Sequence, residues 1–128
     1  MSAPSLRSLT LPKIGSAAAG ADEIARIARN DFPFRLAIES VYFTPEAAVT
    51  ASDTNNATLT IKIGSTTIGT LLTDVAQGDL VAGTPVKITV SGILTIEPGA
   101  VMSVTKTYAG SGAAMIGTVS ALVSEARL

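Results

Sequence analysis

Apolar and hydroxyl-bearing residues alternate along most of the chain after residue 30, and this period of two constrains the fold more than any other feature. In residues 57–63, ATLTIKI, apolar side chains alternate with threonine and lysine, as in a β-strand with one buried face. Further runs of β-forming residues are 35–43, 66–72, 85–90, 93–96, 101–108 and 116–123. Turn-forming Gly, Pro, Asn and Asp separate the runs at intervals of about 8–12 residues, which predicts an all-β sandwich or barrel.

Residues 21–30, ADEIARIARN, fit two kinds of structure. Their apolar residues sit at helical spacing, and the acidic pair Asp22–Glu23 suits a first helical turn. A segment of this length with a thin apolar stripe is a marginal helix, however, and it also fits a short edge strand. We favour the strand because everything that follows is β.

Residues 1–22 are predicted to form an extended N-terminal arm ahead of a β-sandwich domain of residues 23–128. Pro4 and Pro12 oppose helix, and the apolar residues of the arm are too sparse for a core. Those residues are Leu6, Leu9, Leu11 and Ile14. They suit an arm that lies along the surface of a partner, and a tail without fixed structure is the alternative. Charges and prolines interrupt every apolar run here, so we expect no secretory signal and synthesis in the cytoplasm.

Missing residue types exclude much chemistry. The chain has no histidine, cysteine or tryptophan, so it lacks a Ser-His-Asp or Cys-His nucleophile, a usual zinc site and disulfides. Glu39 lies in an apolar strand, where we expect a structural carboxylate paired with Arg35. The acidic loop residues lack the ligand pattern of a calcium loop, and Gly110-Ser111-Gly112 is a turn, not a phosphate loop. We expect no enzyme, no metal and no cofactor.

The composition is poor in charge and rich in small polar residues. Charged residues make up 15% and hydrophobic residues 47%, and mean hydropathy is +0.46. The surface must therefore be largely Thr, Ser, Ala and Gly, either because it faces other protein chains or because it is a hydroxyl-rich exterior. A net charge of −1 argues against nucleic acid as a partner, and no apolar run is long enough to cross a membrane.

A family resemblance begins at Phe32-Pro33-Phe34 and continues through the strand end at 41–45 and the alternating strand at 58–61. Further matching segments are Ala47–Thr50, Asp53–Asn56, Leu94–Gly99 and Gly110–Gly112. Over residues 30–124 the chain resembles the small β-sandwich, or jelly-roll, head decoration (cement) proteins of tailed bacteriophages. This resemblance implies a jelly-roll-like antiparallel β-sandwich.

The resemblance also implies a function. Such proteins bind the outside of the expanded capsid, commonly as trimers, and bridge neighbouring major capsid proteins so that the shell resists internal DNA pressure. It implies a virion location on the capsid exterior, a homotrimer, the major capsid protein lattice as partner, and no small-molecule substrate. The residues expected at the capsid or trimer interface are Leu6, Arg7, Leu9, Leu11, Lys13, Ile14, Arg26, Arg29, Phe32 and Phe34. The alternative is a tail fibre, spike or baseplate module that binds a host-surface glycan.

Overall fold

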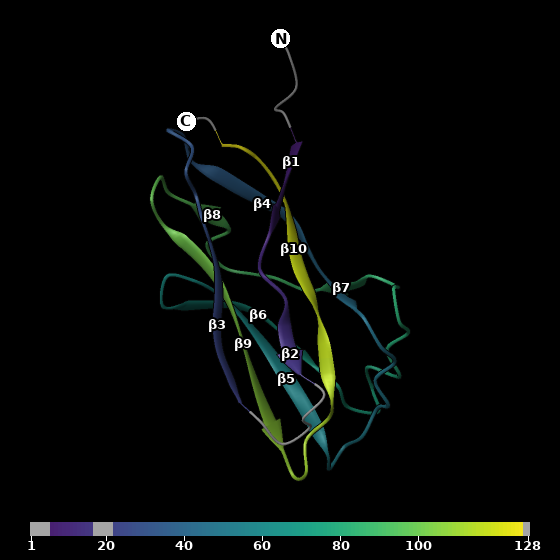
Figure 1. Ribbon diagram of the computed structural model, residues 1–128. Helices are drawn as coiled ribbons and strands as arrows, with labels where there is room; N and C mark the ends of the chain where they lie inside the picture. Colours follow the sequence, from purple (N-terminus) through teal and green to yellow (C-terminus); the bar gives the residue numbers. More distant parts are fainter. Residues whose placement is uncertain (1–5, 17–21, 127–128) are drawn as a thin grey trace.

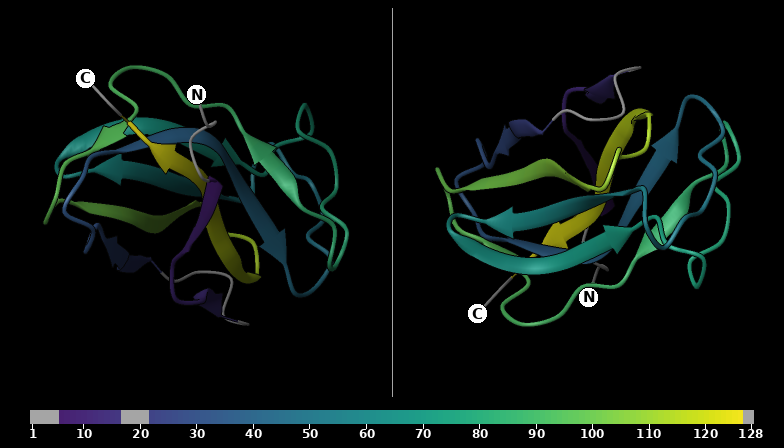
Figure 2. Two further views of the ribbon diagram at one scale, coloured as in Figure 1. Left: turned by 90° about the horizontal axis from the view of Figure 1, so that it is seen from above. Right: turned by 90° about the horizontal axis from the view of Figure 1, so that it is seen from below.

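Two antiparallel β-sheets pack face to face as a sandwich (Figures 1 and 2). The computed structural model describes residues 6–16 and 22–126, and these contain no helix. The strands are β1 Leu6–Thr10, β2 Ile14–Ser16, β3 Glu23–Arg29, β4 Leu36–Pro45, β5 Asn56–Ile63, β6 Thr66–Leu72, β7 Val86–Ile88, β8 Thr95–Ile96, β9 Val101–Ala109 and β10 Met115–Glu125. The described residues include no helix long and apolar enough to span a membrane. The prediction of an antiparallel β-sandwich is confirmed.

Sheet A is organised around the long central strand β10. On one side β10 pairs with β4, and on the other it pairs first with β2 and then with β1 (Figure 1). The far side of β4 carries the short strands β7 and β8. A bulge between Leu122 and Val123 shifts the register of β10 against β4. The N-terminal segment therefore supplies one edge of this sheet.

Sheet B has the strand order β3-β9-β5-β6. Strand β5 pairs along its whole length with β9, from Asn56 opposite Ala109 to Ile63 opposite Met102. Strand β3 forms one edge of the sheet, which confirms that residues 21–30 contain a strand and not a helix. Strand β6 forms the other edge.

The core lies between the inward faces of the two sheets. Alternation places Val119, Ala121 and Val123 of β10 opposite residues such as Leu59 and Ile61 of β5, and all are essentially inaccessible to solvent. Lys106 of β9 also lies on an inward face, where it is fully buried and partnered. The sequence analysis did not predict that this lysine is buried. The alternation of the strand places position 106 on the inward face, but a charged side chain is normally expected to face solvent.

The N-terminal segment differs from the prediction in one respect. Residues 6–16 are extended, as expected, but they lie in sheet A against β10 of the same chain. The expectation that their apolar residues are too sparse for a core is wrong for Leu11 and Ile14, which are each 1% exposed. The physical reason is that the edge of β10 not paired with β4 is open to a further strand. Residues 6–16 pair with this edge, and Leu11 and Ile14 then cover that side of the core. Residues 1–5 and 17–21 of the predicted arm lie outside the described residues.

Candidate functional site

The outward face of sheet A is a surface of hydroxyl side chains with few charges. Because Val119 and Ala121 point into the core, their neighbours on β10 and the residues paired with those neighbours point outward. We call this surface the hydroxyl face; its residues are Leu6, Ser8, Thr10, Tyr42, Thr44, Thr118, Ser120 and Leu122. The charged strand residues at this face are Glu39, which accepts a hydrogen bond of 2.5 Å from Ser124 Oγ, and Lys87, opposite Tyr42.

Two leucines form an apolar spot on the hydroxyl face. Leu122 of β10 is opposite Ser8, and Leu6 of β1 is opposite Ser124, so the two leucines are diagonal neighbours on adjacent strands. Leu6 is 62% and Leu122 is 38% exposed. Leu6 and Leu122 therefore add apolar area to a face that otherwise consists mainly of hydroxyl side chains.

A shallow hollow lies on the same face, towards β7. It has a volume of about 250 Å³ and is lined by Tyr42, Thr44, Pro85 and Ser120. Its walls carry three hydroxyl groups and no formal charge. The surface of the hollow is therefore uncharged, and its hydroxyl groups can donate and accept hydrogen bonds.

Arg7, Phe32 and Phe34, three of the residues predicted at an interface, come together in the structure. The two phenylalanine rings stack with their centroids 5.1 Å apart. The guanidinium carbon of Arg7 lies 4.5 Å from the Phe32 centroid and 5.4 Å from that of Phe34. Arg7 Nε is buried and has no hydrogen-bond partner among the described residues. The arrangement holds β1 to the body of the sandwich through a cation–π contact.

Replacing Arg7 with alanine is expected to reduce the free energy of unfolding by about 1–2 kcal/mol, since both the cation–π contact and the packing of the side-chain stem are lost. Arg29→Ala is the matched control, because its ion pair with Asp31 is largely exposed and should contribute at most about 0.5 kcal/mol. Urea unfolding measures both values. Equal losses in the two variants would show that Arg7 does not anchor β1.

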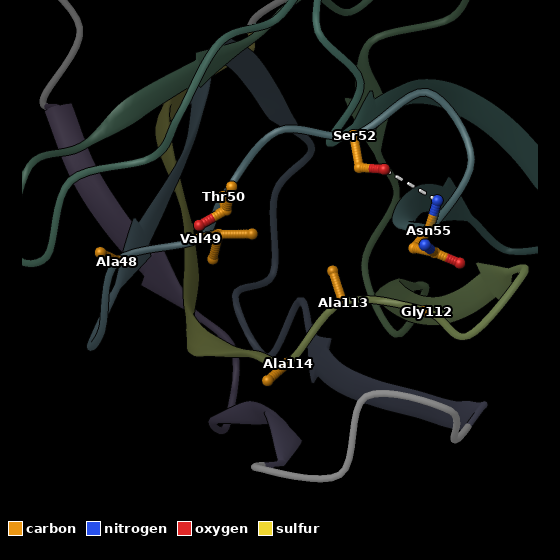
Figure 3. Close-up of a pocket in the computed structure, with 8 residues that line it drawn as sticks. All are labelled: Ala48, Val49, Thr50, Ser52, Asn55, Gly112, Ala113 and Ala114. Carbon is orange, nitrogen blue, oxygen red and sulfur yellow. Dashed lines mark hydrogen bonds between the residues drawn. The ribbon is translucent and has the colours of Figure 1, made fainter.

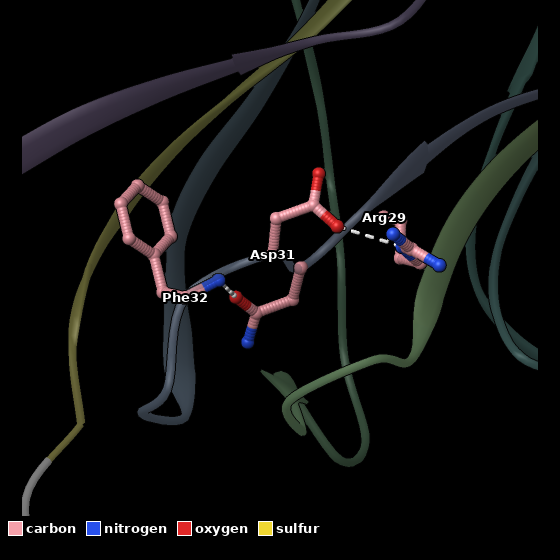
Figure 4. Close-up of polar contacts among 4 residues, drawn as sticks. Arg29, Asp31 and Phe32 are labelled. Atoms are coloured by element: carbon pink, nitrogen blue, oxygen red, sulfur yellow. Dashed lines mark hydrogen bonds and ion pairs between the residues drawn. The ribbon is translucent and has the colours of Figure 1, made fainter.

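Asn30, which sequence analysis had not selected, positions the two phenylalanines. It is 1% exposed, and its side-chain amide donates hydrogen bonds to the backbone oxygens of Phe34 (3.0 Å) and Ile96 (2.8 Å). Its Oδ1 accepts the Phe32 backbone N–H at 3.0 Å, next to the Arg29–Asp31 ion pair (Figure 4). The signal available in the sequence was an asparagine that directly follows a strand, a common turn-forming position.

The remaining predicted interface residues do not join this cluster. Leu9 packs partly buried against the core, where Leu11 and Ile14 are fully buried. Lys13 forms an exposed ion pair of 2.6 Å with Glu46. Arg29 pairs with Asp31, and the side chain of Arg26 lies outside the described residues. The predicted set is thus divided among the cluster of Arg7, Phe32 and Phe34, the hydroxyl face with Leu6, the core, and exposed ion pairs.

The expected pairing of Glu39 with Arg35 is wrong. Arg35 Nε lies 2.7 Å from Glu97 Oε1, and Glu39 instead binds Ser124. Within residues 6–16 and 22–126, no group of three or more acidic side chains is arranged to hold a metal ion.

No protein-family model matches the chain, and no curated protein matches it in sequence. Among solved structures, it is similar to a chain in the structure of infectious bursal disease virus Gx strain, with a TM-score of 0.39 and 17% sequence identity. The match covers 95% of this chain and 32% of that chain. At this level of similarity the likeness supports no conclusion about function.

Proposed function

We propose that the protein is a structural component of a virus particle that binds the outside of a tailed-bacteriophage head and stabilises the shell by bridging major capsid proteins. The observation that carries the proposal is the hydroxyl face, a sheet surface with few charges and two exposed leucines. The sequence resemblance to head decoration proteins over residues 30–124 supports the same function. In this proposal the protein acts by binding alone.

The chemistry of the hydroxyl face suits a lattice partner. Cores of protein interfaces are depleted in charge, because desolvating an unpaired charge is costly. Serine and threonine lose less conformational entropy on burial than long side chains, and they can both donate and accept hydrogen bonds. Even a modest contact gives strong attachment when each molecule, or each trimer, bridges several capsid subunits.

Co-sedimentation with mature heads that lack the protein tests the proposal. The expected result is saturable binding at a copy number compatible with capsid symmetry, and a trimeric mass for the free protein is expected in light scattering. No binding to heads, with the protein found in tail fractions instead, would contradict the proposal. That outcome would favour the fibre or baseplate module.

The surface that binds can be identified with two leucine variants. Leu122 on the hydroxyl face and Leu72 on the outward face of sheet B are 38% and 39% exposed, so they form a matched pair. Leu122→Glu is expected to weaken head binding about 100-fold or more, because it buries an unpaired carboxylate, whereas Leu72→Glu should bind like the unaltered protein. Equal binding by both variants would show that the hydroxyl face does not contact the capsid.

A further inference from the structure

A second pocket lies at the end of the sandwich remote from the described ends of the chain, away from the hydroxyl face. It is formed where the segment between β4 and β5 meets the turn between β9 and β10 (Figures 1 and 3). Its volume is about 370 Å³. The lining residues are Ala48, Val49, Thr50, Ser52, Asn55, Gly112, Ala113 and Ala114, and none of them is charged.

Hydrogen bonds fix the walls of this pocket. Ser52 Oγ accepts the Asn55 backbone N–H at 2.9 Å (Figure 3), and the Ser52 carbonyl accepts the side-chain amide of Asn56 at 3.1 Å. Across the pocket, Asn55 Oδ1 accepts the Ser111 backbone N–H at 2.8 Å. A Cβ atom at Gly110 would lie 2.3 Å from the Thr54 carbonyl oxygen, so glycine permits this close approach of the two loops. The site is therefore shaped before any ligand arrives.

The same bonds determine which groups are available to a ligand. The Asn55 Oδ1 atom is committed to Ser111, so the amide nitrogen presents its two N–H donors elsewhere, and they meet no acceptor among the described residues. Thr50 and Ser52 also line the pocket. Methyl groups of Ala113 and Ala114 lie on the facing segment (Figure 3). The pocket thus combines amide and hydroxyl groups with a small apolar surface and lacks a counter-charge.

We infer that this pocket binds a neutral sugar ring, free or as the terminal unit of a glycan. A pyranose presents hydroxyl groups that can pair with the Asn55 amide, and C–H faces that can pack on the methyl group of Ala113, which points into the pocket (Figure 3). The volume falls within the usual range for small-molecule pockets. An anionic ligand would lose its hydration without gaining a cationic partner, so charged sugars are disfavoured. Because the lining has no aromatic ring, a single site should bind weakly, and under the proposed function the many copies on a particle would increase the total affinity.

Amide chemical shifts of the ¹⁵N-labelled full chain test the inference, with a panel of neutral methyl hexosides and one methyl sialoside titrated to about 50 mM. At least one neutral glycoside is expected to shift residues in 48–55 and 111–114. Asn55→Asp keeps the oxygen that accepts the Ser111 N–H but loses both free donors, and it should weaken binding about tenfold or more. Ala113→Leu extends a side chain that points into the pocket (Figure 3) and should do the same.

The matched control is Gln77→Glu, the same change from amide to acid in an exposed loop residue outside the pocket, which should bind as the unaltered chain does. The inference is overturned by an absence of shifts at these residues with every neutral glycoside. It is equally overturned by preference for the sialoside, or by unchanged affinity in both pocket variants. None of these results depends on whether the hydroxyl face binds a capsid.

Discussion

Replacing either Leu11 or Ile14 with alanine is expected to lower the free energy of unfolding by about 2–5 kcal/mol. Each side chain is 1% exposed and packs in the core cluster, so truncation removes buried apolar contact and leaves a cavity. The backbone at both positions is held by β10: Leu11 N–H donates to the Val119 carbonyl at 3.0 Å, and Ile14 is opposite Gly117. The neighbouring structure therefore cannot readily collapse into the space.

Leu6→Ala is the matched control, because it truncates the same residue type in the same segment at a position that is 62% exposed. Its cost should be at most about 0.5 kcal/mol. Urea denaturation of the three variants gives the comparison. If Leu11→Ala keeps full stability but loses binding to heads, the segment acts as a gripping arm, as the sequence predicts, and its place in sheet A is wrong.

This expectation changes how the role of the N-terminal segment can be tested. Deleting residues 1–20 removes β1, β2 and two core side chains together. A domain of this size has about 5–15 kcal/mol of stability, so the deletion would unfold a large share of the molecules. Loss of head binding by that variant would then reflect unfolding and not a lost contact. Single substitutions on the hydroxyl face, such as Leu122→Glu, separate the two effects.

The alternation of apolar and polar residues predicted most of sheet B. Strands β5 and β9 pair along their whole length, so the alternation runs uninterrupted from one end of each strand to the other. Residues 57–63, 66–72 and 101–108 were each predicted to within one residue of β5, β6 and β9. The runs 85–90 and 93–96 shorten to β7 and β8. Between β7 and β8 the chain stops pairing with β4. Val90 instead forms an isolated bridge with Gly69 of β6, which links the two sheets. Alternation shows which residues face inward but not where a strand changes its partner.

Long-range partners explain what sequence reasoning missed. The leucines of β1 pair with β10, more than 100 residues away, and nothing local distinguishes a strand that joins its own sheet from one that joins a partner. Arg35 and Glu39 are close in sequence, but four residues of extended chain separate side chains by ~13 Å. The pairing of β4 with its neighbours gives them different partners: Arg35 pairs with Glu97, and Glu39 pairs with Ser124. The composition predicts that the surface is rich in hydroxyl groups. It does not predict where they gather, because the hydroxyl face depends on how β1, β10 and β4 are paired.

Asn30→Asp is expected to lower the free energy of unfolding by about 2–4 kcal/mol, although the two side chains have nearly the same shape. Aspartate keeps an oxygen for the Phe32 N–H, but it removes the two N–H donors. The carbonyl oxygens of Phe34 and Ile96 would then face a carboxylate oxygen in a site that is 1% exposed. The cost arises from unsatisfied and repelling acceptors and not from a cavity.

Asn55→Asp is the control for this change, because Asn55 is exposed and its side chain accepts the Ser111 N–H through the oxygen, which aspartate keeps. Its cost should stay within about 0.5 kcal/mol. Thermal unfolding of the two variants separates these values. The result also bears on the cluster of Phe32, Phe34 and Arg7, since Asn30 fixes the backbone that carries both rings. If Asn30→Asp is as stable as Asn55→Asp, the amide does not hold this turn, and the attachment of β1 through Arg7 must rest on the ring contacts alone.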